Sequence, residues 1–283
     1  MALLLMPCVA GAASYYDLKG KPSLKNPIVL VHGASMGGAK LKIGFLRLGE
    51  YFQGIPEFLS QTGTPVFVVN LPTDASIQER AQVLRMEIEQ KFRGQAVNLV
   101  AHSLGGLDAR FLVSRIKYDK VASITTIATP HRGSPLAEWA VRNGQRKTPW
   151  YWLLKLGGFD LNRPRFVPSL VPAAMEGVFN REIRDAEGVR YFSVIAVASR
   201  RRASLAPILW FPDAFLRGEN HPVMSREDND GLVPESSQEW GTVIARVELD
   251  HMGQLNHHFL RFPPVPEKSL SMWFQIYQNL LDR

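Results

Sequence analysis

Short apolar runs rich in β-branched residues alternate along the chain with segments of helical periodicity. The runs cover residues 27–31, 65–70, 96–101, 121–128, 191–197 and 242–249. Short, largely apolar runs of this kind are typical of strands buried on both faces, as in parallel sheets whose strands are joined by helices. The pattern therefore predicts an α/β fold with a mostly parallel central sheet and helices on both faces.

Three helices are predicted between and after these strands. The first begins with Ser76 and Glu79, which have the spacing of a capping box, and ends at Gly94. Its apolar face carries Ile77, Ala81, Leu84 and Ile88. The second follows Ser103, with apolar positions at Leu104, Leu107, Phe111 and Ile116, and the third covers residues 270–281. The first two helices each connect two strands, as βαβ units require.

Residues 134–180 interrupt the alternation of strands and helices. Prolines and glycines recur there, and aromatic residues crowd together: Trp139, Trp150, Trp152 and Phe159. We expect a helical lid inserted at 134–180 into a single domain that spans residues 14–283. The aromatic side chains would either line an apolar groove or form the buried core of the lid itself.

The composition fits one globular domain and narrows the range of partners. The chain has 283 residues, of which 46% are apolar and 21% are charged, and no run of 18 apolar residues is present to cross a bilayer. The formal charge of +7 and the basic run 200–202 would suit an anionic surface, or simply a solvated one. No nucleic-acid-binding motif accompanies the charge, so no nucleic-acid partner is expected.

The N-terminal residues 1–13 partly match a secretory signal. An apolar stretch is followed by small residues, but the usual basic segment is missing. We expect a truncated signal peptide and a secreted or periplasmic protein, with a cytoplasmic protein as the alternative. Cys8 is the only cysteine, so no internal disulfide bond is expected. No oligomeric state is predicted.

The strongest chemical signal is the stretch from Ala101 to Gly106, Ala-His-Ser-Leu-Gly-Gly, between a strand and a helix. A sharp strand-to-helix turn exposes its central serine at the carboxyl edge of the sheet, and it needs small residues two positions before and after that serine. Ala101 and Gly105 meet this requirement, although the common pattern has glycine at the first position. Ser103 is therefore predicted to be a nucleophile, with an incidental serine in a turn as the alternative.

A serine nucleophile needs a histidine base and an acid, here expected in the chain order serine, acid, histidine. Asp230 lies in a polar turn, and His251 follows 21 residues later, directly after a predicted strand. Of the seven histidines, only His251 combines a late position with a loop after a strand. His257 is the rival base, and Asp228 and Asp250 are the rival acids.

Acyl transfer also requires backbone N–H groups that bind the oxyanion of the tetrahedral intermediate. One is expected at Leu104, directly after the proposed nucleophile. The other is expected in the loop after the first strand, where the amide of Ala34 is the best candidate. The sequence thus predicts an oxyanion hole formed by Ala34 and Leu104.

Taken together, these segments make the chain resemble the bacterial true lipases (triacylglycerol lipases) of the α/β-hydrolase superfamily. The resemblance implies an α/β-hydrolase fold and hydrolysis of triacylglycerols or related esters through a serine acyl-enzyme. It also implies a Ser103, Asp230 and His251 triad, the Ala34 and Leu104 oxyanion hole, and a mobile lid over a lipid or other ester at a lipid–water interface. The matching stretches are 29–33, 51–56, 101–110, 128–134 and 229–233, followed by His251.

Two positions depart from the resemblance. Such lipases often bind a structural calcium ion through an aspartate two residues after the catalytic histidine, and this chain has Gly253 there, which offers no side-chain oxygen. Several relatives have a cysteine where this chain has Glu235. We therefore expect no metal, no cofactor and no disulfide bond near the site, and the loop that carries His251 must be secured in another way.

Other functions share the same triad. A short-chain carboxylesterase, a phospholipase and a polyester depolymerase would differ from a lipase only in the shape of the pocket. An acyltransferase would form the same acyl-enzyme but pass the acyl group to an alcohol other than water. A non-catalytic lipid-binding protein would lack a member of the triad, and none is missing here.

Overall fold

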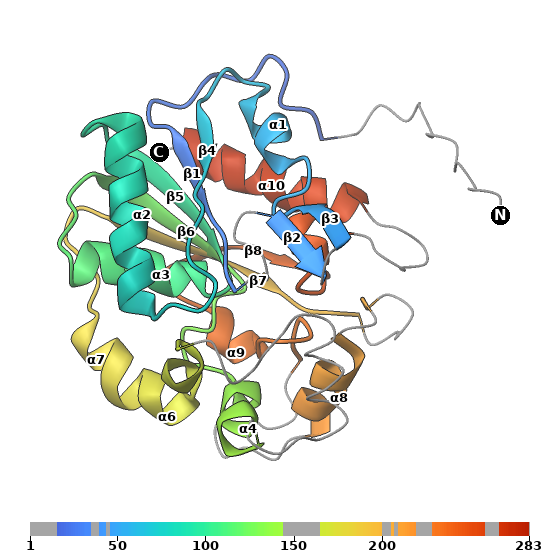
Figure 1. Ribbon diagram of the computed structural model, residues 1–283. Coiled ribbons are helices and arrows are strands. Elements are labelled where there is room, and N and C mark those ends of the chain that lie inside the picture. The colour runs from blue at the N-terminus through green and yellow to red at the C-terminus, as the bar shows by residue number, and fades with distance from the viewer. Residues whose placement is uncertain are drawn as a thin grey trace.

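A six-stranded parallel sheet forms the centre of the described part of the computed structural model (Figure 1). The described residues are 16–34, 40–43, 46–143, 165–199, 205–206, 209–218, 228–257 and 266–282. The strand order is β4-β1-β5-β6-β7-β8, and every pairing is parallel. The strands are β1 (Ile28–Val31), β4 (Val66–Val68), β5 (Val97–His102), β6 (Val121–Ile127), β7 (Arg190–Ala196) and β8 (Thr242–Val247). All six predicted strands are confirmed.

Two helical layers cover the two faces of the sheet (Figure 1). On one face lie α2 (Ile77–Phe92) and α3 (Gly105–Ser114), and on the other lie α1 (Ile55–Ser60) and α10 (Pro266–Leu281). In β1, Ile28 and Leu30 join the apolar cluster of α1 and α10, whereas Val29 and Val31 join that of α2 and α3. Burial on both faces explains why the strands are apolar throughout.

Helix α2 begins at the predicted capping box. The Ser76 hydroxyl accepts a hydrogen bond from the Glu79 amide at 3.3 Å, and the Glu79 carboxylate accepts one from the Ser76 amide at 2.9 Å. The helix ends at Phe92 and is followed by Arg93 and Gly94, which have φ values of 46° and 86°. The predicted start of α2 is confirmed, and its last residue lies two residues before Gly94.

Further helices gather at the end of the sheet where the carboxyl ends of the strands lie (Figure 1). They are α4 (Pro135–Asn143), η1 (Val167–Leu170), α6 (Pro172–Ala174), the π-helical η2 (Met175–Phe179), α7 (Asn180–Glu182), α8 (Trp210–Gly218) and α9 (Glu235–Gln238). Trp139 on α4 contacts Phe211 and Phe215 on α8, with ring centroids 5.7 and 6.1 Å apart. The described residues of this stretch, 134–143 and 165–180, therefore contain helices and no strand.

Several predictions concern residues outside the described ranges. They are the signal segment 1–13 with Cys8, the basic run 200–202, and Trp150, Trp152 and Phe159 of the predicted lid. The lid therefore stays a prediction. Within the described part of the chain, no helix is long and apolar enough to cross a membrane.

The sequence patterns did not predict an antiparallel hairpin, β2 (Lys40–Ile43) with β3 (Leu46–Glu50). Its two strands form a separate small sheet before α1. Both strands are short and carry charged residues, unlike the apolar strands of the central sheet.

Candidate active site

Ser103 occupies a sharp turn between β5 and α3. Its φ is 56°, a left-handed conformation that costs a non-glycine residue energy and is typical of a nucleophile elbow. Three hydrogen bonds hold the turn: the Ser103 amide donates to the Ile127 carbonyl at 2.9 Å, and the Ser103 carbonyl accepts from Thr129 Oγ1 at 2.8 Å and from the Gly106 amide at 3.1 Å. Surrounding bonds thus maintain the strained backbone.

Close backbone approaches explain the small residues around Ser103. A Cβ atom on Gly105 would lie 2.6 Å from the Val31 carbonyl oxygen, where real Cβ atoms are essentially never found. A Cβ atom on Gly33 would lie 2.7 Å from the Cβ of Ser103. The loop after β1 therefore packs directly against Ser103, and both glycines leave the room for it.

Asp230 and His251 are joined by a hydrogen bond of 2.6 Å from the Nδ1 of the imidazole to Oδ2 of the carboxylate. Asp230 is fully buried, and its Oδ1 accepts hydrogen bonds from the amides of Leu232 and Val233 at 3.0 and 2.8 Å. Its Oδ2 also accepts from Nε2 of Gln254 at 2.8 Å. Four donors therefore fix the orientation of this carboxylate.

The His251 ring lies beside the turn that carries Ser103. Its centroid is 4.5 Å from that of His102, the residue before Ser103. Only 6% of His251 is exposed, whereas Ser103 is half-buried. The structure thus brings together the three segments that contain Ser103, Asp230 and His251, although they are far apart in the sequence.

The rival residues have other partners. The Nε2 of His257 is 3.1 Å from the carbonyl oxygen of Tyr51, and Asp228 forms an ion pair with Arg217 at 2.8 Å. Asp250 accepts hydrogen bonds from the amides of Met252, Gly253 and Ala206, at 3.0, 2.7 and 2.8 Å. Asp250 therefore shapes the loop around His251 and does not contact its ring nitrogens.

The loop that contains Ala34 is held by a buried arginine. Arg80 on α2 donates to the carbonyl oxygens of His32 at 2.8 Å and of Gly33 at 3.4 Å, and it forms a fully buried ion pair with Asp108 at 2.8 Å. The carbonyl and amide of a trans peptide point in opposite directions, so the Ala34 amide points away from Arg80. Among the described residues, no acceptor binds the amide of Ala34 or that of Leu104.

His32 secures the same loop as a neutral side chain. Its Nδ1 donates to the Gly33 carbonyl at 2.8 Å, and its Nε2 accepts from the Leu71 amide at 2.9 Å. Burial, assisted by the positive charge of Arg80, lowers the pKa of His32 to about 3. His32 is therefore uncharged at neutral pH, and its role in the loop is structural.

The donor atoms near His251 do not fit a calcium ion. Gly253 has no side-chain oxygen; its amide donates to Asp250 and its carbonyl accepts from the Asn256 amide. The side-chain oxygens of Asp230 are already engaged. The described residues contain no group of three carboxylate, histidine or cysteine side chains arranged to hold a metal. Glu235 forms an ion pair with Arg246.

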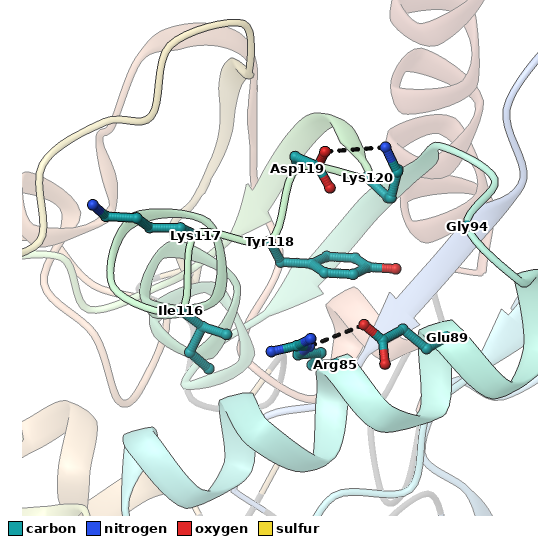
Figure 2. A pocket seen from close by; sticks show the side chains of 8 residues that line it. All are labelled: Arg85, Glu89, Gly94, Ile116, Lys117, Tyr118, Asp119 and Lys120. Atoms are coloured by element: carbon teal, nitrogen blue, oxygen red, sulfur yellow. Dashed lines mark hydrogen bonds and ion pairs between the residues drawn. The ribbon is translucent and has the colours of Figure 1, made fainter.

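A surface pocket occurs at the opposite end of the sheet, before the start of β6 (Figure 2). Charged side chains line it, and two ion pairs join them: Arg85 with Glu89, and Lys120 with Asp119. Because Ser103 follows the carboxyl end of β5, this pocket is not part of the candidate site.

Sequence reasoning missed Arg80, Gln254 and the hydroxyl of Tyr51. Arg80 had a detectable signal, since a charged residue lies there next to the apolar face of the predicted helix. Gln254 lies three residues after His251, but no sequence motif predicts its contacts. Tyr51 opens one of the matching stretches, yet its hydrogen bonds are visible only in the folded structure.

The chain is similar in sequence to two known triacylglycerol lipases. The chain is 34% identical to a triacylglycerol lipase of Vibrio cholerae over 276 residues, which cover 84% of this chain and 82% of that protein. It is 31% identical to triacylglycerol lipase 2 of Saccharomyces cerevisiae over 225 residues, covering 73% of this chain but only 62% of the yeast protein.

Two solved structures have a similar fold. Bacillus licheniformis lipase BlEst2 in its mature form has a TM-score of 0.66 at 22% identity and covers 96% of this chain and 99% of its own. The metagenomic carboxyl esterase MGS0156 has a TM-score of 0.69 at 18% identity and covers 99% and 82%. These two likenesses confirm the predicted fold. The identity to the two triacylglycerol lipases confirms the predicted resemblance and ester-hydrolase class. A model of the alpha/beta hydrolase family matches residues 28–264, and the chain belongs to that family.

Proposed function

We propose that the protein is a triacylglycerol lipase that hydrolyses carboxylic esters through an acyl-enzyme on Ser103. The observation that carries this proposal is the bond of 2.6 Å between His251 and Asp230, beside the strained turn of Ser103. A serine, a histidine and a buried aspartate in this relation are the parts that serine acyl transfer needs. The names of the relatives, triacylglycerol lipases from a bacterium and a yeast, support the choice of substrate.

In the proposed mechanism, the Ser103 hydroxyl attacks the ester carbonyl while Nε2 of His251 takes its proton. The carbonyl oxygen becomes an oxyanion, which accepts hydrogen bonds from the amides of Ala34 and Leu104. The intermediate collapses, and His251 gives the proton to the departing alcohol. Water then attacks the acyl-enzyme with the same base, releasing the fatty acid and restoring Ser103. Asp230 holds the imidazole with Nδ1 protonated throughout.

The proposed domain organisation is a single domain over residues 14–283 with a lid within 134–180. The aromatic cluster of Trp139, Phe211 and Phe215 lies at the carboxyl end of the sheet, on the side of Ser103. Nearby on α4 and α8, Val141 and Trp210 are 50% and 45% exposed. These apolar groups support a substrate with long acyl chains at a lipid–water interface. Export through residues 1–13 is part of the same proposal.

The test is hydrolysis of p-nitrophenyl butyrate, p-nitrophenyl palmitate and an emulsified triacylglycerol by the wild type and by Ser103→Ala. We expect the wild type to hydrolyse the triacylglycerol and Ser103→Ala to lose at least about 1,000-fold in kcat/KM. Ser114→Ala, a half-buried serine at the end of α3, is the matched control and should retain activity. Activity that survives Ser103→Ala would remove Ser103 from the mechanism.

The same assays separate the alternatives. Hydrolysis of the butyrate ester alone would indicate a carboxylesterase, a class supported by the likeness to the carboxyl esterase MGS0156. Transfer of the acyl group to an added alcohol in preference to water, seen by product analysis, would indicate an acyltransferase.

A further inference from the structure

Five groups at the site form one continuous hydrogen-bonded network, and of these the mechanism above uses only Asp230. Gln254 Nε2 is 2.8 Å from Asp230 Oδ2, and Gln254 Oε1 is 2.8 Å from His102 Nε2. His102 Nδ1 is 2.8 Å from the Tyr51 hydroxyl, which lies 3.1 Å from the Gly33 amide nitrogen. The hydrogen bonds therefore connect Asp230, the acid of the proposed triad, to the loop that carries Ala34.

The chemistry of the end groups fixes the direction of every bond. An ionised carboxylate only accepts, so the amide NH2 of Gln254 must face Asp230 and its carbonyl must face His102. His102 therefore donates from Nε2. At the other end, the Gly33 amide only donates, so the Tyr51 oxygen accepts from it and the Tyr51 hydroxyl donates to Nδ1 of His102. His102 is thus neutral, with its proton on Nε2.

Burial supports this assignment. Tyr51, His102 and Gln254 are 3%, 0% and 0% exposed, so water does not compete for their hydrogen bonds. Burial lowers the pKa of His102 well below its usual value, and the nearby His251 lowers it further. Burial also raises the pKa of the Tyr51 hydroxyl, which keeps that group a donor.

Gln254 is itself anchored at the backbone. Its carbonyl oxygen accepts a hydrogen bond of 2.9 Å from the indole of Trp273, which is fully buried on α10. Its amide donates to the carbonyl of Asp250 at 3.2 Å. The loop after His251 is therefore attached to the helix layer and to Asp230 by protein groups, at a place where Gly253 offers no side-chain metal ligand.

We propose that Gln254 is a positioning residue that orients Asp230 and, through His102 and Tyr51, couples the triad acid to the oxyanion loop. The proposal rests on the proposed function, because it assigns Gln254 an effect on the His251 base and the oxyanion loop. Gln254 does not touch the substrate in this role. Gln254 donates a hydrogen bond to Oδ2 of Asp230, the same oxygen that accepts from His251. It also sets the tautomer of His102.

The tautomer of His102 is tested without any activity assay. In 15N-histidine NMR of the full-length protein, we assign His102 as the signal that His102→Gln removes, and we expect it to stay neutral and protonated on Nε2 between pH 5 and 8. In Gln254→Met, His102 should lose the hydrogen bond that its Nε2 donates to the side-chain carbonyl of Gln254. The 15N chemical shift of Nε2 should then change clearly. A proton on Nδ1 of His102, or titration of His102 between pH 5 and 8, would overturn the assigned hydrogen-bond directions.

The kinetic test compares Gln254→Met and Gln254→Glu with Gln238→Met. Gln238 is the matched control, since it is an equally buried glutamine whose side chain bonds only to the backbone of Ala196 and Val233. Per active site, titrated with a fluorophosphonate, we expect Gln254→Met to lower kcat about 10- to 100-fold with KM changed less than twofold. Gln238→Met should reduce the yield of folded protein and leave kcat per site within about twofold.

Gln254→Glu should change the pH dependence of kcat/KM, which would stay the same if Gln254 only stabilised the fold. The added carboxylate can still accept from His102, but it faces Asp230 with a negative charge, which favours the protonated form of the neighbouring imidazole. We expect the acidic limb of the kcat/KM profile to move to higher pH by about one unit. An unmoved limb together with wild-type kcat in Gln254→Met would overturn the role of Gln254.

A double variant tests whether the hydrogen-bonded groups from Asp230 to Gly33 act as one unit. Tyr51→Phe breaks it at the oxyanion loop and Gln254→Met breaks it at Asp230. If the groups are coupled, the double variant should lose clearly less activity than the product of the two single losses. Losses that multiply would mean two independent contacts. Normal Gln254 variants beside an inactive Ser103→Ala would reject only this inference, whereas an active Ser103→Ala would reject the proposed function itself.

Discussion

The two ends of the sheet both carry ionisable side chains, but in different surroundings. At the amino end, Arg85 and Glu89 are each 45% exposed and lie beside the pocket of Figure 2. At the carboxyl end, the side chains of Asp230 and His251 are 0% and 7% exposed. Only the second pair is held by further hydrogen bonds that fix its orientation.

This difference decides where chemistry is expected. An exposed ion pair contributes about 0–1 kcal/mol, because water and salt screen it and both side chains lose freedom. A buried and fully bonded pair cannot rotate or be screened, so it keeps a proton acceptor in one orientation. A hollow lined with charges is therefore a weaker sign of an active site than a buried group with every bond direction fixed.

The largest effect is expected from Asp230→Asn. The amide cannot hold the protonated Nδ1 of His251 as a carboxylate does, so kcat should fall about 1,000- to 10,000-fold. Asp250→Asn is the matched control, because Asp250 bonds to the backbone of the same loop and does not contact the His251 ring nitrogens. Steady-state kinetics and thermal unfolding of both variants check this. If Asp250→Asn lost more activity than Asp230→Asn, the acid would be misassigned.

Gly33→Ala should have the next largest effect. The added methyl would meet the Cβ of Ser103 at 2.7 Å, so the loop that carries Ala34 must shift away from the nucleophile. We expect kcat to fall about 100-fold, as for the loss of one oxyanion donor. Gly177→Ala is the control, since nothing lies within 4 Å of its added Cβ. Equal kinetics in the two variants would contradict the close approach.

The sequence predicted the parts of this comparison that depend on local pattern. The six apolar strands and the capping box at Ser76 are written in consecutive residues, and the small residues around Ser103 mark a sharp turn. Chain order and a post-strand loop were enough to favour His251 over His257, and the hydrogen bonds of the structure support that preference.

The long-range contacts of the site were not predictable from pattern. Gln254 lies 152 residues after His102 in sequence, and an isolated glutamine has no periodicity or spacing that reports its partner. The buried Arg80 and the hairpin of β2 and β3 were missed for a related reason: a short or single polar signal is decided by tertiary packing, not by propensity.

Acid should destabilise the protein through its buried histidines. Burial lowers the pKa of His32 to about 3 and also lowers the pKa values of His102 and His131. Below about pH 6.5 the unfolded chain binds protons that these folded side chains do not, so the free energy of unfolding falls with pH. Burial raises the pKa of Asp108 to about 6, which works in the opposite direction over part of this range.

Burial also lowers the pKa of His257, so four histidines act against one aspartate and a net loss is expected. His32 contributes about 1 kcal/mol between pH 6.5 and 5.5, because each unit of pKa difference corresponds to about 1.36 kcal/mol. The other histidines act in the same direction, so the free energy of unfolding should fall between these two pH values. Urea unfolding at the two pH values measures it, and His32→Gln should reduce the dependence by one histidine. Constant or rising stability on acidification would mean that these histidines are protonated in the folded state.

The smallest effect is expected at the amino end of the sheet. Arg85→Ala, Glu89→Ala and the double variant should show a coupling energy below about 0.5 kcal/mol, the usual value for an exposed pair spaced i,i+4 on a helix. Ester hydrolysis should be unchanged in all three, because no described contact joins these residues to Ser103. Chemical denaturation and steady-state kinetics check both statements. A loss of activity in Glu89→Ala without a loss of stability would show that the pocket of Figure 2 takes part in function, and the contrast between the two ends would then fail.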